Sequence, residues 1–326
     1  MKLLMIKKIF LICNVIFITC LSFQAQSQTY PNKPVKLVVG FPPGGMADIV
    51  ARELGERLSM VWKQSVIVEN RPGASGTIAA DAIAKANPDG YSLLVILTNH
   101  VVVAAIRPKL PYDSFKDFAP VSLVGDSPLV LMANPKLPVN SLAQLVSLAK
   151  SKPGMVTYST PGDGSIHHLS QELMDSSLGI KMVHVPYIGG APAMLDAMTG
   201  VVDLNIGSPS QAIQQIKAGK LKALSYSGLK RSLLLPEVPT VAETLIPGFH
   251  AALWAGVLAP AKTPKELVSK IQSDIKVAMS GPEIKEKMDK LGIEIITSSP
   301  EEFDQYLKSE FNKWSSVARQ ANIKSD

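Results

Sequence analysis

Two short glycine-rich loops are the segments of this sequence best suited to binding chemistry. The first is Phe41–Asp48 (FPPGGMAD) and the second is Ser159–Ser165 (STPGDGS). Each follows an apolar run that is typical of a buried strand and precedes a helical pattern. Glycine lets the backbone approach a ligand closely, and a helix start offers unpaired N–H groups with a partial positive charge. The two loops therefore predict an anion site built from backbone groups.

A purely structural interpretation of the loops stays open. Asp48 and Ser165 are residues that complement or cap the start of a helix, so each loop could be a turn and no more. Two such loops in one chain favour the ligand site. Neither contains the Gly-Lys-Ser/Thr of a phosphate-binding loop or a G-x-G-x-x-G followed by an acidic residue, so nucleotide binding has little support.

Catalytic and metal-binding alternatives are weaker. No G-x-S-x-G is present. Ser165 precedes His167 and His168, which admits a hydrolase, but the sequence assigns no partner acid. His168 and Glu172 could ligate a metal from one helix face. A structural role is favoured for His167 and His168 and for the remaining histidines His100, His184 and His250. We therefore expect no catalytic residue, metal or cofactor.

The elements around the loops predict an α/β protein of two lobes. Strands are expected at 35–41, 65–69 and 91–98, separated by helices at 46–59 and 77–86. This order predicts lobes with a mainly parallel sheet flanked by helices. Strands near 119–125 and 129–133 are expected to cross to a second lobe. Trp254 belongs to a later strand at 252–258, and we favour a position in the hydrophobic core for its side chain over contact with a ligand. The later pattern predicts helices at 141–150, 165–178, 191–198, 210–218, 264–279, 282–291 and 300–320, with strands at 155–159, 181–185, 202–206, 221–227 and 252–258.

These elements divide the chain into predicted domains. Residues 28–128 and 248–326 form lobe 1, and residues 129–247 form lobe 2. The ligand cleft is expected between the lobes.

The first 27 residues have the order of a secretory signal peptide. Lys2, Lys7 and Lys8 precede an apolar run over 9–23, and Ala25-Gln26-Ser27 supplies small residues for cleavage. Cleavage is expected after Ser27, with Ala25 as the alternative. An uncleaved anchor and a lipidated Cys20 are less favoured. Export to the periplasm follows.

Composition excludes several classes of site. Cys13 and Cys20 both lie in the leader, so the mature chain has no disulfide or thiolate metal site. Removing the three leader lysines reduces the formal charge from +6 to about +3. Because no Lys/Arg-rich run is present, no nucleic-acid partner is expected. No later segment is apolar enough to span a membrane.

Motifs along nearly the whole mature chain resemble one family. They are GFPPGG (40–45) with Asp48, Ala51 and Arg52, VENRPGASG (68–76), ANPDGY (86–91), LPYD (110–113), DFAPV (117–121), GDGS (162–165) with His168 and Leu169, HVPY (184–187), APA (191–193) and LPEVPT (235–240) with Glu243. The chain resembles the substrate-binding proteins of tripartite tricarboxylate transporters, also called Bug proteins.

The resemblance implies a fold, a ligand and partners. The fold is the two-lobed periplasmic binding protein fold with Venus-flytrap closure. The ligand is a small carboxylate, held by backbone amides of the two loops with ordered water. The partners are membrane permease subunits or, alternatively, a sensor ectodomain. The protein itself is expected to be a monomer. The expected ligand-binding residues are Phe41, Gly44, Gly45, Met46, Asp48, Thr98, Asn99, Thr160, Gly162, Gly164, Ser165, Tyr187, Gly189 and Ser208.

Departures from the family pattern bear on the ligand. Ile188 stands where the family commonly has Lys, Ile206–Ser208 stand where a Phe-Asp stretch is common, and Ala79 replaces a frequent Gly. Loss of an acidic residue disfavours recognition of an amino group. A mono-, di- or tricarboxylate or an aromatic acid is therefore expected rather than an amino acid.

Overall fold

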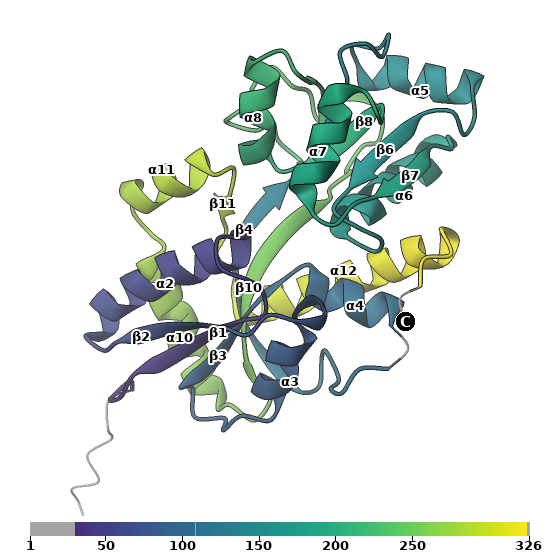
Figure 1. The fold of residues 1–326 in the computed structure, drawn as a ribbon. Coiled ribbons are helices and arrows are strands. Elements are labelled where there is room, and N and C mark those ends of the chain that lie inside the picture. The colour runs from purple at the N-terminus through teal and green to yellow at the C-terminus, as the bar shows by residue number, and fades with distance from the viewer. Residues whose placement is uncertain (1–29, 108, 325–326) are drawn as a thin grey trace, which may run out of the picture. The chain divides into compact units, whose positions relative to one another are not determined.

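The computed structural model describes residues 30–107 and 109–324. The predicted signal peptide at residues 1–27 lies outside the described residues. From Pro34 onward the chain forms one compact unit, and its described strands assemble into two sheets (Figure 1).

The first sheet has the strand order β11-β4-β10-β3-β1-β2. β1 pairs in parallel with β2 and β3, whereas β10 pairs antiparallel with β3 and β4. The apolar run predicted from the sequence is buried, since Leu37, Val38 and Val39 are almost inaccessible to solvent. The strands are β1 (Val35–Val39), β2 (Val66–Asn70), β3 (Ser92–Leu97), β4 (Phe118–Pro128), β10 (Ala252–Pro260) and β11 (Glu294–Ile295).

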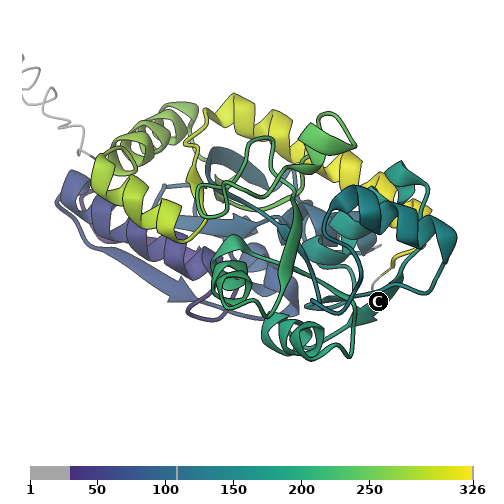
Figure 2. The ribbon, with the colours of Figure 1, turned by 90° about the horizontal axis from the view of Figure 1, so that it is seen from above.

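Helices cover this sheet by burying their apolar faces. Helix α2 packs on β1 and β2, whereas α12 packs on β4 and α4. In Figure 2, α10 and α11 lie beside α2, and ion pairs join α11 to α2 through Lys287–Glu53 and Arg57–Glu283. The helices are α2 (Met46–Trp62), α3 (Thr77–Ala84), α4 (Asn99–Ile106), α10 (Lys265–Ala278), α11 (Pro282–Lys290) and α12 (Pro300–Gln320), with a 3₁₀ turn at Ala74–Gly76.

The second sheet has the strand order β7-β6-β8-β5-β9. β6 pairs in parallel with β7 and β8, and β5 pairs antiparallel with β8 and β9. Its strands are β5 (Val130–Ala133), β6 (Thr157–Thr160), β7 (Val183–Pro186), β8 (Leu204–Gly207) and β9 (Lys222–Tyr226). The associated helices are α5 (Leu142–Ser151), α6 (Ile166–Leu178), α7 (Gly190–Thr199), α8 (Pro209–Lys217) and α9 (Val241–Thr244).

The predicted α/β two-lobed class is confirmed, with one refinement in strand direction. The parallel pairing holds for β2-β1-β3 and β7-β6-β8, but both sheets are mixed rather than mainly parallel. The antiparallel pairs come from β10 and β4 in the first sheet and from β5 in the second. The predicted boundaries at 128/129 and 247/248 stay a prediction.

Helix α4 was not predicted from the sequence. Its sequence, NHVVVAAI, is rich in β-branched residues and follows β3 directly, so it reads as more strand. Packing against α12 outweighs that propensity, because Val101, Val102 and Val103 are all buried. Trp254 is fully buried, as the favoured core interpretation required.

Candidate functional site

The first glycine loop joins β1 to the start of α2. Gly45 is the N-cap residue of α2, with φ −85° and ψ 173°, and no described side chain caps this helix. Residues 42–45 are exposed, and Gly44 has a φ of +89° that favours glycine. The positive dipole end of α2 therefore lies at an exposed turn without a capping side chain, while Ala47 and Asp48 in its first turn are buried.

Asp48 holds this loop from inside. Its Oδ2 accepts hydrogen bonds from the Gly44 N–H at 3.0 Å and from Arg52 Nε at 2.9 Å. Its Oδ1 accepts from Asn70 Nδ2 at 2.9 Å and pairs with Arg52 Nη2 at 2.9 Å. Asp48 is only 3% exposed. The sequence predicts Asp48 as a ligand-binding residue, which stays a prediction; in the structure its carboxylate holds the loop.

The protonation of Asp48 follows from these contacts. The hydrogen bond from Arg52, together with those from Gly44 and Asn70, outweighs the effect of burial and lowers the Asp48 pKa to about 2. The carboxylate therefore stays ionised down to strongly acidic pH, and the loop keeps its conformation with it.

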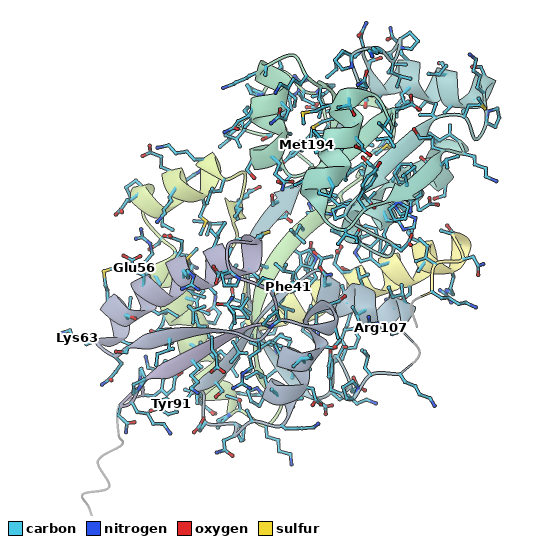
Figure 3. All side chains as sticks on the ribbon, in the orientation of Figure 1. Phe41, Glu56, Lys63, Tyr91, Arg107 and Met194 are labelled. Atoms are coloured by element: carbon cyan, nitrogen blue, oxygen red, sulfur yellow. The ribbon has the colours of Figure 1, made fainter. Side chains whose placement is uncertain are left out.

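Phe41 and Asn99 lie near the same edge of the first sheet. Because β1 and β3 are adjacent and parallel, their carboxyl ends meet there. The Phe41 ring lies close to the backbone of Gly76, and Figure 3 labels Phe41 at this end of the first sheet. Asn99 is partly exposed at the start of α4, whose N-terminus has no side-chain cap from the described residues. Thr98, by contrast, is fully buried and bonds to the backbone of Ala252 and Trp254.

The second glycine loop joins β6 to α6 and satisfies its own polar groups. Ser165 is the N-cap of α6: its Oγ accepts from the His168 N–H at 3.3 Å and donates to the Gly162 carbonyl at 2.8 Å. Thr160 Oγ1 accepts from the Gly162 N–H at 3.3 Å. Gly162 and Gly164 have φ values of +143° and +64°, which explains the need for glycine.

A side chain from the first turn of α6 also holds this loop. The Gly164 N–H donates to Nδ1 of His168 at 3.2 Å, which requires an unprotonated Nδ1. Gly164 is itself buried. The Gly164 N–H is thus used by His168 as the Gly44 N–H is used by Asp48, but α6 has a side-chain cap and α2 has none from the described residues.

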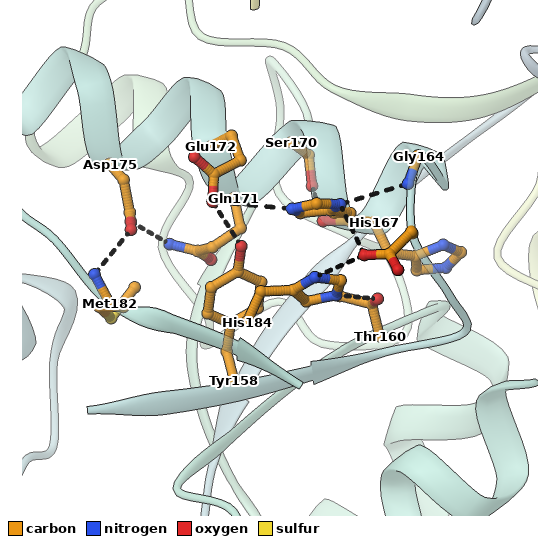
Figure 4. Close-up of polar contacts among 12 residues, drawn as sticks. Tyr158, Thr160, Gly164, His167, Ser170, Gln171, Glu172, Asp175, Met182 and His184 are labelled. Carbon is orange, nitrogen blue, oxygen red and sulfur yellow. Dashed lines mark hydrogen bonds and ion pairs between the residues drawn. The ribbon is translucent and has the colours of Figure 1, made fainter. Parts of the chain in front are cut away.

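His168 belongs to a polar cluster between β6, β7 and α6 (Figure 4). Its ring stacks on that of His184 with centroids 3.7 Å apart and planes inclined by 19°. His184 Nε2 bonds to Thr160 Oγ1 at 2.6 Å, and its Nδ1 lies 3.2 Å from Asp163 Oδ1. Nε2 of His168 lies 3.8 Å from Oε1 of Glu172.

Burial controls the charge of this cluster. Desolvation, followed by the nearby His184, lowers the pKa of His168 to about 4, despite the opposing effect of Asp163. Burial likewise lowers the pKa of His184, with Asp163 acting in the opposite direction. Both rings are therefore neutral at pH 7, and protonation of either one disfavours protonation of its neighbour.

The cluster fits a metal poorly. One ligand atom each from Asp163, His168 and His184 lies within 4.8 Å of the others. Imidazole donates its lone pair in the plane of the ring, and two nearly parallel stacked rings do not direct their lone pairs to one point. In addition, Nδ1 of His168 already accepts the Gly164 N–H.

The other predicted residues of the second lobe lie at neighbouring strand ends. The Gly189 N–H donates to the Pro161 carbonyl at 3.3 Å, and Tyr187 lies beside Gly162. The Tyr187 hydroxyl donates to Asp196 Oδ2 at 2.6 Å. Gly189 and Ser208 are the N-cap residues of α7 and α8, and neither helix receives a side-chain cap from a described residue. These helix starts are the lobe-2 counterparts of the start of α2.

Sequence reasoning left a helix-start role open for Asp48 and favoured a structural role for His168, but did not identify the loop amide that each side chain accepts. Asp48 and His168 each stand four residues after the glycine whose N–H they accept. That spacing places a side chain of the first helical turn beneath the preceding loop. It was visible in the sequence and could have assigned both residues a positioning role.

Comparison with known proteins places this architecture among periplasmic solute-binding proteins. A protein from Rhodopseudomonas palustris solved with adipate is 33% identical, with a TM-score of 0.77 over 90% of this chain and 99% of that protein. MatC from the same organism, solved with bound malate, is 31% identical, with a TM-score of 0.73 over 88% of this chain and 99% of MatC.

The family follows from sequence. Residues 50–323 match the model of the tripartite tricarboxylate transporter family receptor, and the chain belongs to that family. Protein BugT of Bordetella pertussis is 36% identical over 300 residues, which cover 91% of this chain and 92% of BugT. The resemblance inferred from the motifs is thereby confirmed. No helix in the part of the chain that the structure describes is long and apolar enough to cross a membrane.

Proposed function

We propose that this protein is a periplasmic receptor that captures a small carboxylate and delivers it to the membrane subunits of a tripartite tricarboxylate-type transporter. Membership of the receptor family supports the role. Structural neighbours bound to adipate and malate support the ligand class. Export through residues 1–27 and a monomeric state belong to the same proposal.

The observation that carries the proposal is the uncapped start of α2. The exposed Gly44–Gly45 turn leaves space beside it, since a Cβ added at either glycine would meet nothing within 4 Å. A carboxylate placed there would accept the first N–H groups of α2 and lie at the positive end of its dipole. The ligand carboxylate would accept from backbone N–H groups in the way that the Asp48 carboxylate accepts from the Gly44 N–H.

We divide the fourteen predicted site residues into two groups on the basis of their contacts. Contact with the ligand is assigned to residues that lie at the first glycine loop or at a helix start without a side-chain cap: Phe41, Gly44, Gly45, Met46, Asn99, Gly189 and Ser208. Positioning is assigned to residues whose polar groups are engaged within the protein: Asp48, Thr98, Thr160, Gly162, Gly164, Ser165 and Tyr187.

The same contacts support a role without catalysis. Ser165 Oγ donates its hydrogen to the Gly162 carbonyl, and the bond between Ser165 and His168 uses the backbone N–H of the histidine. A serine nucleophile requires its hydroxyl to donate to the imidazole of its general base. We therefore assign no hydrolase activity to this pair.

Thermal unfolding of residues 28–326 with a carboxylate library tests the proposal. Adipate, malate and benzoate represent the flexible, hydroxylated and aromatic classes. A ligand at 100 times its Kd adds about 2.7 kcal/mol of stability, which raises the Tm by roughly 5 °C in a domain of this size. Mass spectrometry of the denatured protein detects any co-purified acid. Absence of both a Tm increase and a co-purified carboxylate would overturn the proposal.

A further inference from the structure

The second glycine loop carries an acidic side chain that the carboxylate site does not use. Asp163 lies between the two glycines of this loop, and its side chain is 74% exposed. Its ion-pair contacts are with histidines, since Oδ1 lies 3.2 Å from Nδ1 of His184 and 3.9 Å from Nδ1 of His168. Because burial lowers the pKa of both histidines, neither ring carries a compensating charge at pH 7. The loop therefore presents a negative charge.

An apolar side chain stands at the same edge of the second sheet. Ile188 follows β7 and is fully exposed. The backbone on either side of it is fixed to the second glycine loop, because the Tyr187 N–H donates to the Thr160 carbonyl at 3.0 Å and the Gly189 N–H donates to the Pro161 carbonyl at 3.3 Å. Since β6 and β7 are adjacent and parallel, this side chain and the acid follow strands that end side by side.

This edge of the second sheet lies against a helix of the first. A Cβ placed on Gly164, the residue after the acid, would meet Cδ1 of Ile106 at 2.8 Å. Ile106 ends α4, and Asn99, which we assign to ligand contact, begins the same helix. The second glycine loop is therefore close to the elements that supply the proposed carboxylate site.

The carboxylate site itself offers attraction for one anionic group. The residues assigned to ligand contact include no charged side chain. Arg52 beside the first loop is paired with Asp48 at 2.9 Å. Arg71, which follows β2, is paired with Glu69 at 2.5 Å. Attraction at the start of α2 thus comes from backbone groups and about half a positive charge. A second carboxylate that reached the second loop would meet Asp163, which repels it.

We infer that the ligand is a monocarboxylate with an uncharged, apolar far end, and that Asp163 and Ile188 determine this specificity. Asp163 disfavours a second anionic group by like-charge repulsion, and Ile188 offers contact area to an apolar chain end. This specificity rests on the proposed function, because it takes the start of α2 as the position of the carboxylate.

Calorimetric titration of residues 28–326 with hexanoate and adipate tests the assigned ligand class. The two acids have carbon chains of the same length and differ only at the far end, where hexanoate has a methyl group and adipate a second carboxylate. We expect hexanoate to bind at least about tenfold more tightly than adipate. Adipate is a stringent choice, because a structural neighbour was solved with it.

Two substitutions of exposed residues should reduce this preference. Asp163→Asn keeps an acceptor for His184 and removes the charge, so the ratio of hexanoate to adipate affinity should fall at least about threefold. Ile188→Lys supplies a cation, so adipate affinity should rise at least about threefold. Glu237→Gln is the matched control, because it removes an exposed acid that lies outside the second glycine loop. Both affinities of this control should equal those of wild type.

The outcomes separate the ligand class from the proposed function. Adipate that binds wild type as tightly as hexanoate would overturn the inferred class and leave carboxylate capture in place. A preference that is unchanged in both Asp163→Asn and Ile188→Lys would overturn the role of these residues. Binding of neither acid would also overturn the inferred class, and the Tm library then decides the proposed function separately.

Discussion

The two glycine loops use the same backbone arrangement with different side chains. In each, a glycine N–H donates to a side chain four residues later, Asp48 for Gly44 and His168 for Gly164. The first acceptor is a carboxylate paired with Arg52, whereas the second is a neutral imidazole stacked on His184. The helix of the first loop lacks a side-chain cap from the described residues, whereas Ser165 caps the helix of the second.

This difference assigns the loops different tasks. The first loop is held by Asp48, and α2 has no side-chain cap from the described residues, as the proposed anion site requires. The second loop satisfies its own donors and depends on the protonation of a histidine. Similar glycine patterns in a sequence therefore need not supply similar binding groups.

The largest effect is expected from removing the acceptor of the first loop. Asp48→Ala deletes a buried carboxylate that accepts from Gly44, Arg52 and Asn70, and should lower the free energy of unfolding by about 3 kcal/mol. Urea denaturation at pH 7 measures it. Carboxylate affinity should fall as well, because the Gly44–Gly45 turn loses its support. A loss below about 0.5 kcal/mol would show that Asp48 does not hold the loop.

Mild acid should destabilise the second glycine loop and not the first, because only the second depends on a neutral histidine, His168. Its folded pKa is about 4 and its ordinary value is 6.5, so the unfolded chain binds more protons between these values. The stability that depends on neutral His168 is complete above pH 6.5 and is lost as pH falls toward 4. The difference between these two pKa values corresponds to a loss of roughly 3 kcal/mol in the free energy of unfolding. Asp48, with a pKa of about 2, remains ionised at pH 4.5.

The measurement is urea denaturation of wild type and His168→Asn from pH 7 to 4. Wild type should lose more stability than the variant over this range. Asp175 acts in the opposite direction, because burial raises its pKa to about 7 and it favours the folded state as pH falls from 7 toward 3.8. Because wild type and His168→Asn both contain Asp175, its contribution cancels in the difference between their free energies of unfolding. Parallel pH curves would contradict the assigned role of His168. His100→Asn in α4 is a positive control that should also flatten the curve, because burial lowers the pKa of His100 to about 4.

A smaller effect is expected from the cap of the second loop. Ser165→Ala removes the acceptor of the His168 N–H and should cost about 1 kcal/mol. Ser141→Ala at the start of α5 is the matched control, because Ser141 caps Gln144 in the same way. Since Ser165 is assigned no contact with the ligand, carboxylate affinity should change less than threefold, or about 0.6 kcal/mol. A larger loss would return Ser165 to the ligand-contact group.

Much of the fold could be predicted from periodicity and glycine punctuation. Buried strands such as Val35–Val39 have continuous apolar runs, and Gly44–Gly45 ends the first of them before α2. Helix α4 could not be predicted, because its valines favour a strand locally and only packing on α12 makes them helical. Strand direction in β10 depends on pairing with β3 and β4, which are distant in sequence.

The location of the ligand site stays a prediction, and the hydrogen bonds within its loops could not be read from the sequence. The loops were found because glycine spacing is a local signal. The bonds that consume Thr160 and Tyr187 involve His184 and Asp196, whose partners are set by the tertiary fold.

The central claim is that the start of α2 binds the carboxylate, and Gly45→Ala tests it most directly. Gly45 has a negative φ and no neighbour within 4 Å of an added Cβ, so alanine should leave folding intact while its methyl occupies the space beside the first N–H groups. Gly55→Ala in the same helix is the control, because its added methyl meets side chains at ordinary contact distances of 3.4 Å and more.

Calorimetric titration with the carboxylate that gives the largest Tm increase provides the measurement. We predict that Gly45→Ala binds at least about tenfold more weakly than wild type, equivalent to about 1.4 kcal/mol, and that Gly55→Ala binds as wild type does. Wild-type affinity in Gly45→Ala would contradict the claim and place the carboxylate elsewhere.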